Sequence, residues 1–403
     1  MIYRTFESLH SPNYRRWFIG QLFSLLGTWM QSTAQGYLIF ELTGSAAYLG
    51  YVGFASGLPS WFFTLYGGVI ADRVPRRKMI FIAQSAMMLL AFVLAALTFT
   101  GLVRPWHILV LAMLLGVANA FDAPARQAFV SELVDRDTLT NAIALNATMF
   151  NTATVVGPAA AGLVYAWVGP GWCFLINGLS FISVLISLVA MRLAPFTQPS
   201  RHSGAWDDIR EGFRFVRGNQ IVLLLIVGMG MVSAFGFGVV TLVPVWAVDV
   251  LGGDVRTNGL LLSARGAGSL IAAVMTAALG YRNVRGRLWT AGSFLVPLTL
   301  LAFSLIRLLP LSLILMVLTG WGLMAINNNA NALVQTLIPD ELRGRVMGIF
   351  TLVFFGGAPL GSLWAGTLAD HFGAPAVVAV NAVILLCFAV FIWLRYPIIR
   401  RQS

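Results

Sequence analysis

The chain has 403 residues and a formal net charge of +11, yet only 10% of its residues are charged and 58% are hydrophobic. Water-soluble domains carry roughly a quarter charged residues, so this composition excludes a soluble globular protein. The 26 Lys and Arg residues lie almost wholly between apolar runs. In that position they report membrane topology, so the positive charge does not indicate a nucleic-acid partner.

Apolar segments long enough to cross a bilayer recur along the whole chain. A hydrocarbon core ~30 Å thick needs about 20 apolar residues per helix, and the alternating ~10-residue segments of a β-barrel are absent. We therefore predict an all-α integral membrane protein with twelve transmembrane helices in two pseudo-symmetric six-helix bundles. The predicted spans are residues 16–40, 47–70, 78–100, 105–129, 139–166, 171–191, 219–248, 256–279, 287–306, 309–336, 343–369 and 374–396.

A polar stripe runs along the first span. Ser24, Thr28, Gln31 and Gln35 follow one another at helical spacing, so they share one face of the helix. This face is predicted either to line a central substrate cavity or to supply polar contacts between helices, which contribute about 1 kcal/mol each. The sequence leaves both interpretations open.

The stretch GGVIADRVPRRKMI, residues 67–80, concentrates charge between the second and third spans. Gly68 allows a neighbouring helix to approach closely, and Asp72 falls at the membrane surface, where the N-terminus of another helix carries partial positive charge. The basic residues of the stretch are Arg73, Arg76, Arg77 and Lys78. The cluster is predicted to be a gating latch, and the alternative is a basic anchor that only fixes topology.

Partners for this latch are predicted at two places. The segment PDELRGR at the start of the eleventh span carries Arg343 and Arg345. At the inner end of the fourth span, Asp122 and Arg126 are four residues apart and can form an ion pair. Asp122 has three open interpretations: a latch partner for Arg76, a buried proton acceptor, or one half of a simple helix-end ion pair.

Amide side chains are enriched in two further spans. Asn146 and Asn151 lie in the fifth span, while Asn327 and Asn331 belong to the run NNNAN in the tenth. Consecutive asparagines cannot all face one way. We therefore predict that one or two of these amides line the substrate cavity and that the others serve packing.

Arg265 lies inside the eighth span and is the residue most costly to place in lipid. A mid-span arginine costs ~2.5–3.5 kcal/mol on the insertion scale, so it should face a cavity or a partner. It is predicted to be a counter-charge for an anionic substrate or one half of a coupling pair. The alternative is a side chain that extends toward the outer membrane surface.

Residues 192–218 form the longest hydrophilic stretch and divide the chain into bundles at 1–191 and 219–403. The stretch ends in an amphipathic segment from Trp206 to Val216, predicted to lie on the cytoplasmic leaflet. With the N-terminus inside, 22 Lys and Arg fall in inner segments and three in outer ones. This asymmetry predicts that both termini are cytoplasmic.

The two halves repeat one order of features. LVDRDTLTNAIAL and GPAAAG in the first half correspond to LIPDELRGRVMGI and GGAPLG about 200 residues later. An internal repeat of six spans is how many secondary transporters are built.

The charged loop resembles the signature of the major facilitator superfamily, G-x-L-a-D-r-x-G-r-k-x-x-l, with Pro75 in place of the usual glycine. The stretch ATVVGPAAAG in the fifth span resembles the motif associated with antiporters, through Gly157, Pro158 and Gly162. FDAPARQAFV, NAIALNATMFN and GWCFLING are similar to the branch of enterobactin exporters and macrolide efflux pumps. The family's span-four arginine is replaced by Ala112, so proton coupling rests on resemblance alone.

These features together predict a secondary transporter that exports a small amphiphilic compound, a drug-like molecule or a siderophore, across a bacterial inner membrane by alternating access. The resemblance implies that protons are the coupling partner of this transport, and the protein is expected to lie in the lipid bilayer. The alternatives are a transporter of lysolipid or lipid and a non-transporting receptor or assembly partner. No phosphate loop, metal-ligand spacing or nucleophile constellation is recognised, so neither an enzyme nor a cofactor is expected.

Overall fold

The computed structural model describes residues 6–193, 205–279 and 284–399, and within them it leaves the side chains of residues 64–73, 205–209, 277 and 279 undescribed. These described residues form helices and no strand. The long helices of the first half are α2 (Pro12–Thr43), α3 (Ala46–Arg73), α4 (Arg76–Phe99), α5 (Pro105–Phe129), α6 (Leu139–Val168) and α7 (Pro170–Ala190). Those of the second half are α8 (Ala205–Gly218), α9 (Gln220–Met231), α11 (Val255–Leu279), α12 (Arg285–Leu305), α13 (Leu309–Leu337), α14 (Arg343–Phe372) and α15 (Ala374–Arg395).

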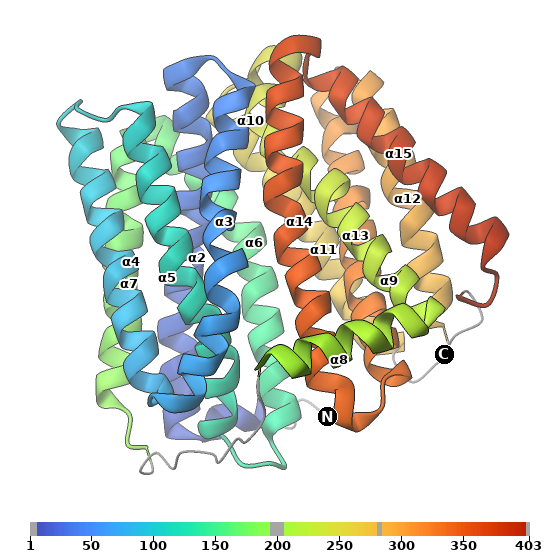
Figure 1. Ribbon diagram of the computed structural model, residues 1–403. Helices are drawn as coiled ribbons and strands as arrows, with labels where there is room; N and C mark the ends of the chain where they lie inside the picture. The colour runs from blue at the N-terminus through green and yellow to red at the C-terminus, as the bar shows by residue number, and fades with distance from the viewer. Residues whose placement is uncertain (1–5, 194–204, 280–283, 400–403) are drawn as a thin grey trace. The chain divides into compact units, whose positions relative to one another are not determined.

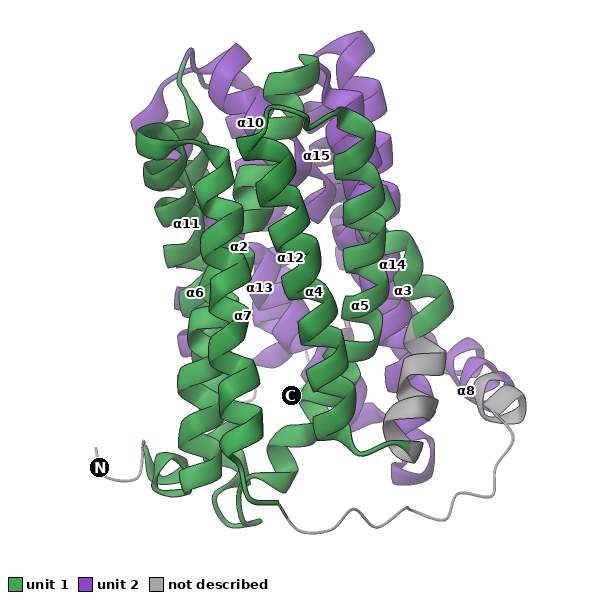
Figure 2. Cartoon of the chain, turned by 90° about the vertical axis from the view of Figure 1, so that its left-hand side faces the viewer, with its two compact units in different colours: residues 1–44, 55–200, 253–263 green, residues 45–54, 201–252, 264–403 purple. Residues whose placement is uncertain are grey.

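The chain folds into two compact units, which Figure 2 distinguishes by colour. Unit 1 comprises residues 1–44, 55–200 and 253–263, and unit 2 comprises residues 45–54, 201–252 and 264–403. The first turns of α3 therefore belong to unit 2, and the first turns of α11 belong to unit 1.

Ten helical segments of the described chain are long and apolar enough to cross a membrane. They coincide with the predicted spans from the third to the twelfth. The predicted first and second spans correspond to α2 and α3, with 32 and 28 residues, which are not among the ten. α2 carries the polar stripe, and the side chains in the last part of α3 are not described. The protein is thus a multi-pass helical membrane protein.

Proline and glycine set several helix ends, which is why the span boundaries are close to those predicted. Pro105 and Pro170 occupy the first residues of α5 and α7, where the missing N–H and the fixed φ suit the first turn. Gly44 and Gly169 follow α2 and α6 with φ of 61° and 92°, conformations that other residues rarely adopt. The chain therefore turns sharply at these positions.

The seventh predicted span is continuous in extent but irregular in geometry. After α9 it passes through a π-helical turn η3 (Val232–Gly236), a 3-10 segment η4 (Phe237–Leu242), the short α10 (Val243–Val245) and a second π-helical turn η5 (Trp246–Val250). Gly236, Gly238 and Pro244 lie in this region. Glycine and proline are poor helix formers, and proline also lacks a backbone donor, so they favour these departures from α-helix.

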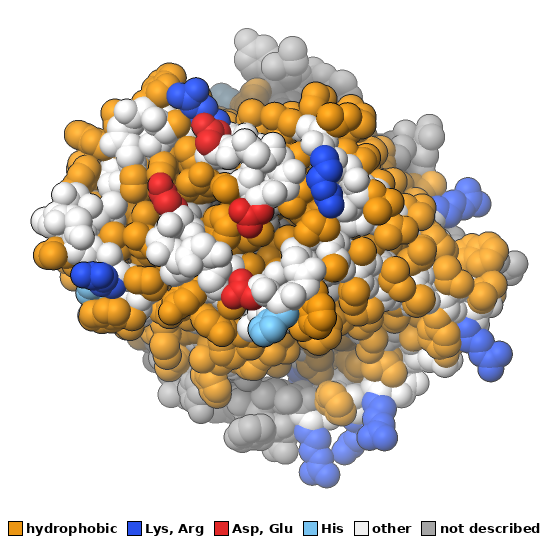
Figure 3. All heavy atoms as spheres, turned by 90° about the horizontal axis from the view of Figure 1, so that it is seen from above, with side chains coloured by type: hydrophobic (Ala, Val, Ile, Leu, Met, Phe, Trp, Pro, Cys, Tyr) orange, Lys and Arg blue, Asp and Glu red, His pale blue; other side chains and the backbone are white. Residues whose placement is uncertain are grey.

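The outer surfaces of the helices are apolar, as a lipid solvent requires. Leu89, Trp167 and Val274 are 62%, 70% and 62% exposed. Figure 3 looks onto the helix ends, where acidic, basic and other polar side chains lie among the hydrophobic ones. Two charged residues of the described chain, Asp122 and Arg265, are buried instead.

Unit 1 has an aromatic core where α2 begins. Tyr14 and Trp17 of α2 are fully buried with Phe129 of α5, and the Trp17 and Phe129 rings meet edge-on with centroids 5.2 Å apart. The Tyr14 hydroxyl donates a 2.8 Å hydrogen bond to the carbonyl oxygen of Ala142 on α6. This core fixes the end of α5, which carries Asp122 and Arg126, against the starts of α2 and α6.

The predicted amphipathic segment forms α8, which lies against the first turns of α14 (Figure 1). A Cβ placed on Gly212 would lie 3.1 Å from the Cβ of Arg345, so the two helices approach closely there. The opposite face exposes Phe213 together with Arg210 and Arg214.

Candidate functional site

A buried ion pair lies inside unit 1. The Asp122 side chain on α5 is 1% exposed, and its Oδ2 lies 3.4 Å from Nε of Arg126, one turn further along the helix. Its Oδ1 accepts a 3.0 Å hydrogen bond from Nε2 of Gln84 on α4. The predicted pair is therefore present, and each carboxylate oxygen has a partner within the bundle.

Two latch candidates hold the start of α4 in unit 1. Nη1 of Arg76 lies 2.7 Å from Oε1 of Glu132 on η2 (Val130–Glu132), which follows α5. Nη2 of Arg77 donates a 3.1 Å hydrogen bond to the carbonyl oxygen of Val189, near the end of α7. Arg76 thus pairs with Glu132, which the sequence reasoning did not single out, and not with Asp122.

The other latch candidates lie on α3 and at the start of α14. The positions that fall outside the described side chains are Gly68, Asp72 and Arg73. Arg343 pairs with Asp340 three residues earlier, and this pair is largely exposed. Arg345 pairs with Glu211 of α8, so it fastens the amphipathic helix to α14 within unit 2.

The glycine–proline motif of α6 lies in tight contact on two sides. A Cβ on Gly157 would lie 2.5 Å from the Cβ of Trp29 on α2. A Cβ on Gly162 would lie 3.1 Å from the Cα of Arg256, in the first turn of α11. Pro158 lies buried inside the helix between them. In unit 1 the motif therefore lets α6 touch both α2 and the first turns of α11.

The polar candidates of α2 are mostly occupied within unit 1. Oε1 of Gln31 accepts a 2.7 Å hydrogen bond from Nδ2 of Asn177 on α7, and both residues are buried. The Thr28 hydroxyl donates to a carbonyl one turn earlier in its own helix. Gln35 is buried and its side chain makes no hydrogen bond with any residue that the structure describes.

The amide candidates of α6 also have partners. Nδ2 of Asn151 donates a 2.8 Å hydrogen bond to a carbonyl of the preceding turn. Oδ1 of Asn146 accepts from the Tyr14 hydroxyl at 3.4 Å. These contacts favour a packing role for both amides in the arrangement seen here.

Arg265 is 7% exposed in unit 2, and its buried Nε has no hydrogen-bond partner among the described residues. The backbones of α11 and α13 touch at this level. A Cβ on Gly320 would collide with the Arg265 carbonyl, and a Cβ on Gly268 would collide with the Val317 carbonyl. A buried guanidinium with incomplete hydrogen bonding is costly unless a ligand or cavity offsets the cost.

A polar pocket of about 490 Å³ opens in unit 2 at the end of α11, the start of α12 and the amide run of α13. Its lining residues are Ala273, Thr276, Arg285, Asn327, Asn328, Asn331 and Ala332. The pocket brings Asn327, Asn328 and Asn331 of the amide run together with two polar residues that were not predicted, Thr276 and Arg285. Asn329 is buried elsewhere and donates a 2.8 Å hydrogen bond to the carbonyl of Ala325.

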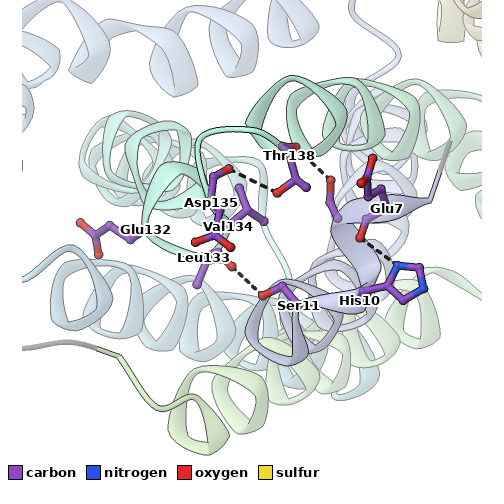
Figure 4. Close-up of a pocket in the computed structure, with 9 residues that line it drawn as sticks. Glu7, His10, Ser11, Glu132, Leu133, Val134, Asp135 and Thr138 are labelled. Atoms are coloured by element: carbon purple, nitrogen blue, oxygen red, sulfur yellow. Dashed lines mark hydrogen bonds between the residues drawn. The ribbon is translucent and has the colours of Figure 1, made fainter. Parts of the chain in front are cut away.

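A larger hollow of about 700 Å³ lies in unit 1 between η1 (Glu7–His10) and the connection from α5 to α6 (Figure 4). The Ser11 hydroxyl donates a 2.7 Å hydrogen bond to the Leu133 carbonyl, and the Ser8 hydroxyl donates at 3.1 Å to the Thr138 carbonyl. These bonds fasten the N-terminal segment to the α5–α6 connection. No predicted site residue lines this hollow.

Three residues that pair with the predicted charged residues could not be predicted from the sequence, and the reason is the same for each. Gln84, Glu132 and Glu211 complete charged candidates that are 38, 56 and 134 residues away. Helical spacing relates residues three or four apart, so no local pattern points to such partners. From the sequence, Arg285 was interpreted only as one of the basic residues that indicate membrane topology.

The chain is similar to known proteins over nearly its full length. The family model for transmembrane secretion effectors matches residues 4–403. The chain is 25% identical over 378 residues to the staphyloferrin A transporter of Staphylococcus aureus, covering 92% of this chain and 94% of that protein. It is 30% identical over 377 residues to the multidrug efflux pump Tap of Mycolicibacterium fortuitum, covering 89% and 90%. It is 27% identical over 406 residues to the enterobactin exporter EntS of Shigella flexneri, covering 97% and 93%.

Solved structures with a similar fold are also transporters. A bacterial homologue of the human lysosomal transporter Spinster superposes with a TM-score of 0.76 at 15% identity, covering 98% of both chains. The nucleoside transporter NupG gives a TM-score of 0.71 at 12% identity, covering 95% of this chain and 99% of that one. At these identities the likeness establishes the fold and not the substrate.

Proposed function

The chain belongs to the transmembrane secretion effector family within the major facilitator superfamily, and we propose that it exports a small amphiphilic compound, a drug-like molecule or a siderophore, by alternating access. The relatives are transporters and not enzymes, and their names supply both substrate classes. The observation that carries the proposal is the pocket of about 490 Å³ in unit 2, which is lined by amide, hydroxyl and guanidinium side chains at the ends of apolar helices. This volume lies within the range of about 300–1,000 Å³ that small-molecule sites occupy.

We also propose that α2 and α3 complete the ten candidate spans to twelve. The functional bundles would then be residues 1–191 and 219–403, joined by residues 192–218. The distribution of 22 inner and three outer Lys and Arg supports a bacterial inner membrane protein with both termini in the cytoplasm.

The gating latch remains a proposal centred on Asp72 of α3 and the basic residues that follow it. The contacts of Arg76 with Glu132 and of Arg77 with the end of α7 support it, because they already tie this loop to other segments of unit 1. Arg345 is the proposed counterpart in unit 2, where it now holds α8.

Proton exchange is the proposed energy source, with Asp122 as the group that gains and loses the proton. Of the carboxylates whose burial is described, Asp122 is the buried one. A buried carboxylate changes its proton occupancy when a charged partner such as Arg126 approaches or withdraws. Breaking the Asp122–Arg126 contact during the transport cycle would couple proton movement to the change of conformation.

The test is the accumulation of dyes, antibiotics and siderophores in pump-deficient bacteria that express the protein. We expect the wild type to lower the accumulation of at least one compound several-fold. Collapse of the proton gradient should abolish this effect, and Asp72→Asn should weaken it while the protein stays in the membrane.

Asp135→Asn is the matched control, because Asp135 is an exposed acid in the connection between α5 and α6. It should export like the wild type. Equal accumulation with and without the protein, for every compound, would refute export and favour a lipid substrate or a non-transporting role.

A further inference from the structure

We propose that the pocket formed by α11, α12 and α13 binds a carboxylate group of the exported compound. The inference rests on the proposed export function and narrows its substrate class to acids. It depends on the charge of the pocket, on the hydrogen-bond donors that line it, and on the way in which the helices create it.

The described lining of the pocket carries a positive charge. Arg285 is the one charged residue among the described lining residues, and none of them is an acid. Its guanidinium makes no ion pair or hydrogen bond with any residue that the structure describes. Arg76, Arg126 and Arg345, by contrast, each have a carboxylate partner. A guanidinium presents a planar set of donors that fits a carboxylate through two parallel hydrogen bonds.

The polar groups beside Arg285 can also donate hydrogen bonds. Oγ1 of Thr276 is buried without a partner among the described residues. Oδ1 of Asn331 accepts a 2.7 Å hydrogen bond from Gln335, which leaves the Asn331 amide hydrogens available. The amides of Asn327 and Asn328 make no hydrogen bond with a described residue. A carboxylate accepts hydrogen bonds only, so it is the ligand that would satisfy these donors together with Arg285.

The crossing of α11 and α13 explains why a pocket exists at this place. Gly268 and Gly320 let the two backbones touch, and the Ser269 hydroxyl donates a 3.2 Å hydrogen bond to the Gly320 carbonyl. The pocket begins about two turns further along both helices. Helices that cross at one point diverge away from it, and the small Ala273 and Ala332 leave the diverging space unfilled.

Arg265 extends the same chemistry along α11. It precedes Thr276 by eleven residues, which is about three turns and roughly 16 Å, so both residues occupy nearly the same face of the helix. Its buried Nε also has no partner in the described chain. This face of α11 therefore carries a second guanidinium about three turns from the pocket.

The test is equilibrium binding to the purified full-length protein in nanodiscs of zwitterionic lipid, followed by fluorescence polarisation. The probes are carboxyfluorescein, which is anionic, and rhodamine 123, which is cationic. A hydrogen bond to a charged group contributes about 1.5–3 kcal/mol, so Arg285→Gln should weaken carboxyfluorescein binding by at least about tenfold. Arg285→Lys should weaken it less, and binding of rhodamine 123 should not change.

Arg287→Gln is the matched control, because Arg287 lies two residues away on α12, is exposed, and does not line the pocket. It should bind carboxyfluorescein within about twofold of the wild type. Absence of carboxyfluorescein binding to the wild type, or equal binding by all three arginine variants and the wild type, would overturn the proposal.

Two further outcomes separate the possible sources of the anion. Competition by phosphatidylglycerol in the nanodisc that disappears in Arg285→Gln would assign the pocket to a lipid headgroup and overturn its assignment to substrate. Arg285-dependent binding by a protein that exports no compound would refute the proposed function while supporting the carboxylate site.

Discussion

Two regions of this membrane protein place a charged side chain among polar groups, and they differ in whether that charge has a partner within the protein. In unit 1, one carboxylate oxygen of Asp122 pairs with Arg126 and the other accepts a hydrogen bond from Gln84. The charge therefore has its partners within the protein. In unit 2, Arg285 lines a pocket whose described residues supply amide and hydroxyl donors and include no acid. Both regions lie on apolar helices, but only in the first does the charged side chain have a counter-charge among the described residues.

The difference separates internal structure from ligand binding. A buried charge that has its own counter-charge and hydrogen bonds has its partners within the protein, and it does not require a ligand. Donors grouped around a guanidinium that has no partner among the described residues are available to a ligand. The first region therefore suits coupling or stability, and the second suits recognition of an anion.

The largest expected loss of stability follows removal of Arg126, the counter-charge of Asp122. Arg126→Met should lower the free energy of unfolding by about 3 kcal/mol, because it leaves the carboxylate of Asp122 buried with only Gln84 as a partner. Arg285→Met should change it by no more than about 0.5 kcal/mol, because no internal partner is lost. Unfolding in mixed micelles with increasing SDS measures both. Equal losses of unfolding free energy in the two variants would contradict the claim that Arg126 has an internal partner and Arg285 has none.

A smaller effect is expected for the other half of the ion pair. Asp122→Asn should cost about 1 kcal/mol, because asparagine can still accept the hydrogen bond from Gln84 and no longer carries a buried charge. A double-mutant cycle with Arg126→Met should give a coupling of about 1–3 kcal/mol in the same SDS titration. Strict additivity of the two substitutions would show that the groups are not coupled.

The smallest effect is expected at the partly exposed pair of unit 1. The Arg76 and Glu132 side chains are 20% and 32% exposed, so water and salt screen their attraction. Glu132→Gln should therefore lower stability by less than about 1 kcal/mol, and by less still at high salt. A loss as large as that of Arg126→Met would mean that burial does not decide the strength of these pairs.

The spans were predictable because length and apolar composition alone determine them. Every span from the third to the twelfth has a matching helix, and the amphipathic helix α8 lies where its pattern indicated. The irregular course of the seventh span was not predicted. Glycine and proline are common in transmembrane helices, so their presence at Gly236 and Pro244 did not specify π-helical and 3-10 turns.

The candidate site was predictable only where its residues are neighbours in sequence. The spacing of Asp122 and Arg126 predicted their pair. The amide run was predicted to contribute one or two residues to a cavity, and Asn327 and Asn331 both line the pocket. The residues that complete these groups, Gln84 and Arg285, come from other helices. Their positions depend on how helices cross, which a single sequence does not encode in any local pattern.

The measurement that tests the central claim most directly is transport by the purified full-length protein in liposomes with an acidic lumen. We predict that liposomes containing the wild type accumulate carboxyfluorescein faster than protein-free liposomes and that equal pH on both sides slows this uptake. Arg285→Gln should also slow it, while Arg287→Gln should not. A weak acid left to itself distributes away from an acidic lumen, so passive leakage cannot imitate the result. Uptake no faster than in protein-free liposomes, with the protein folded and inserted, would contradict a proton-driven exporter of acids.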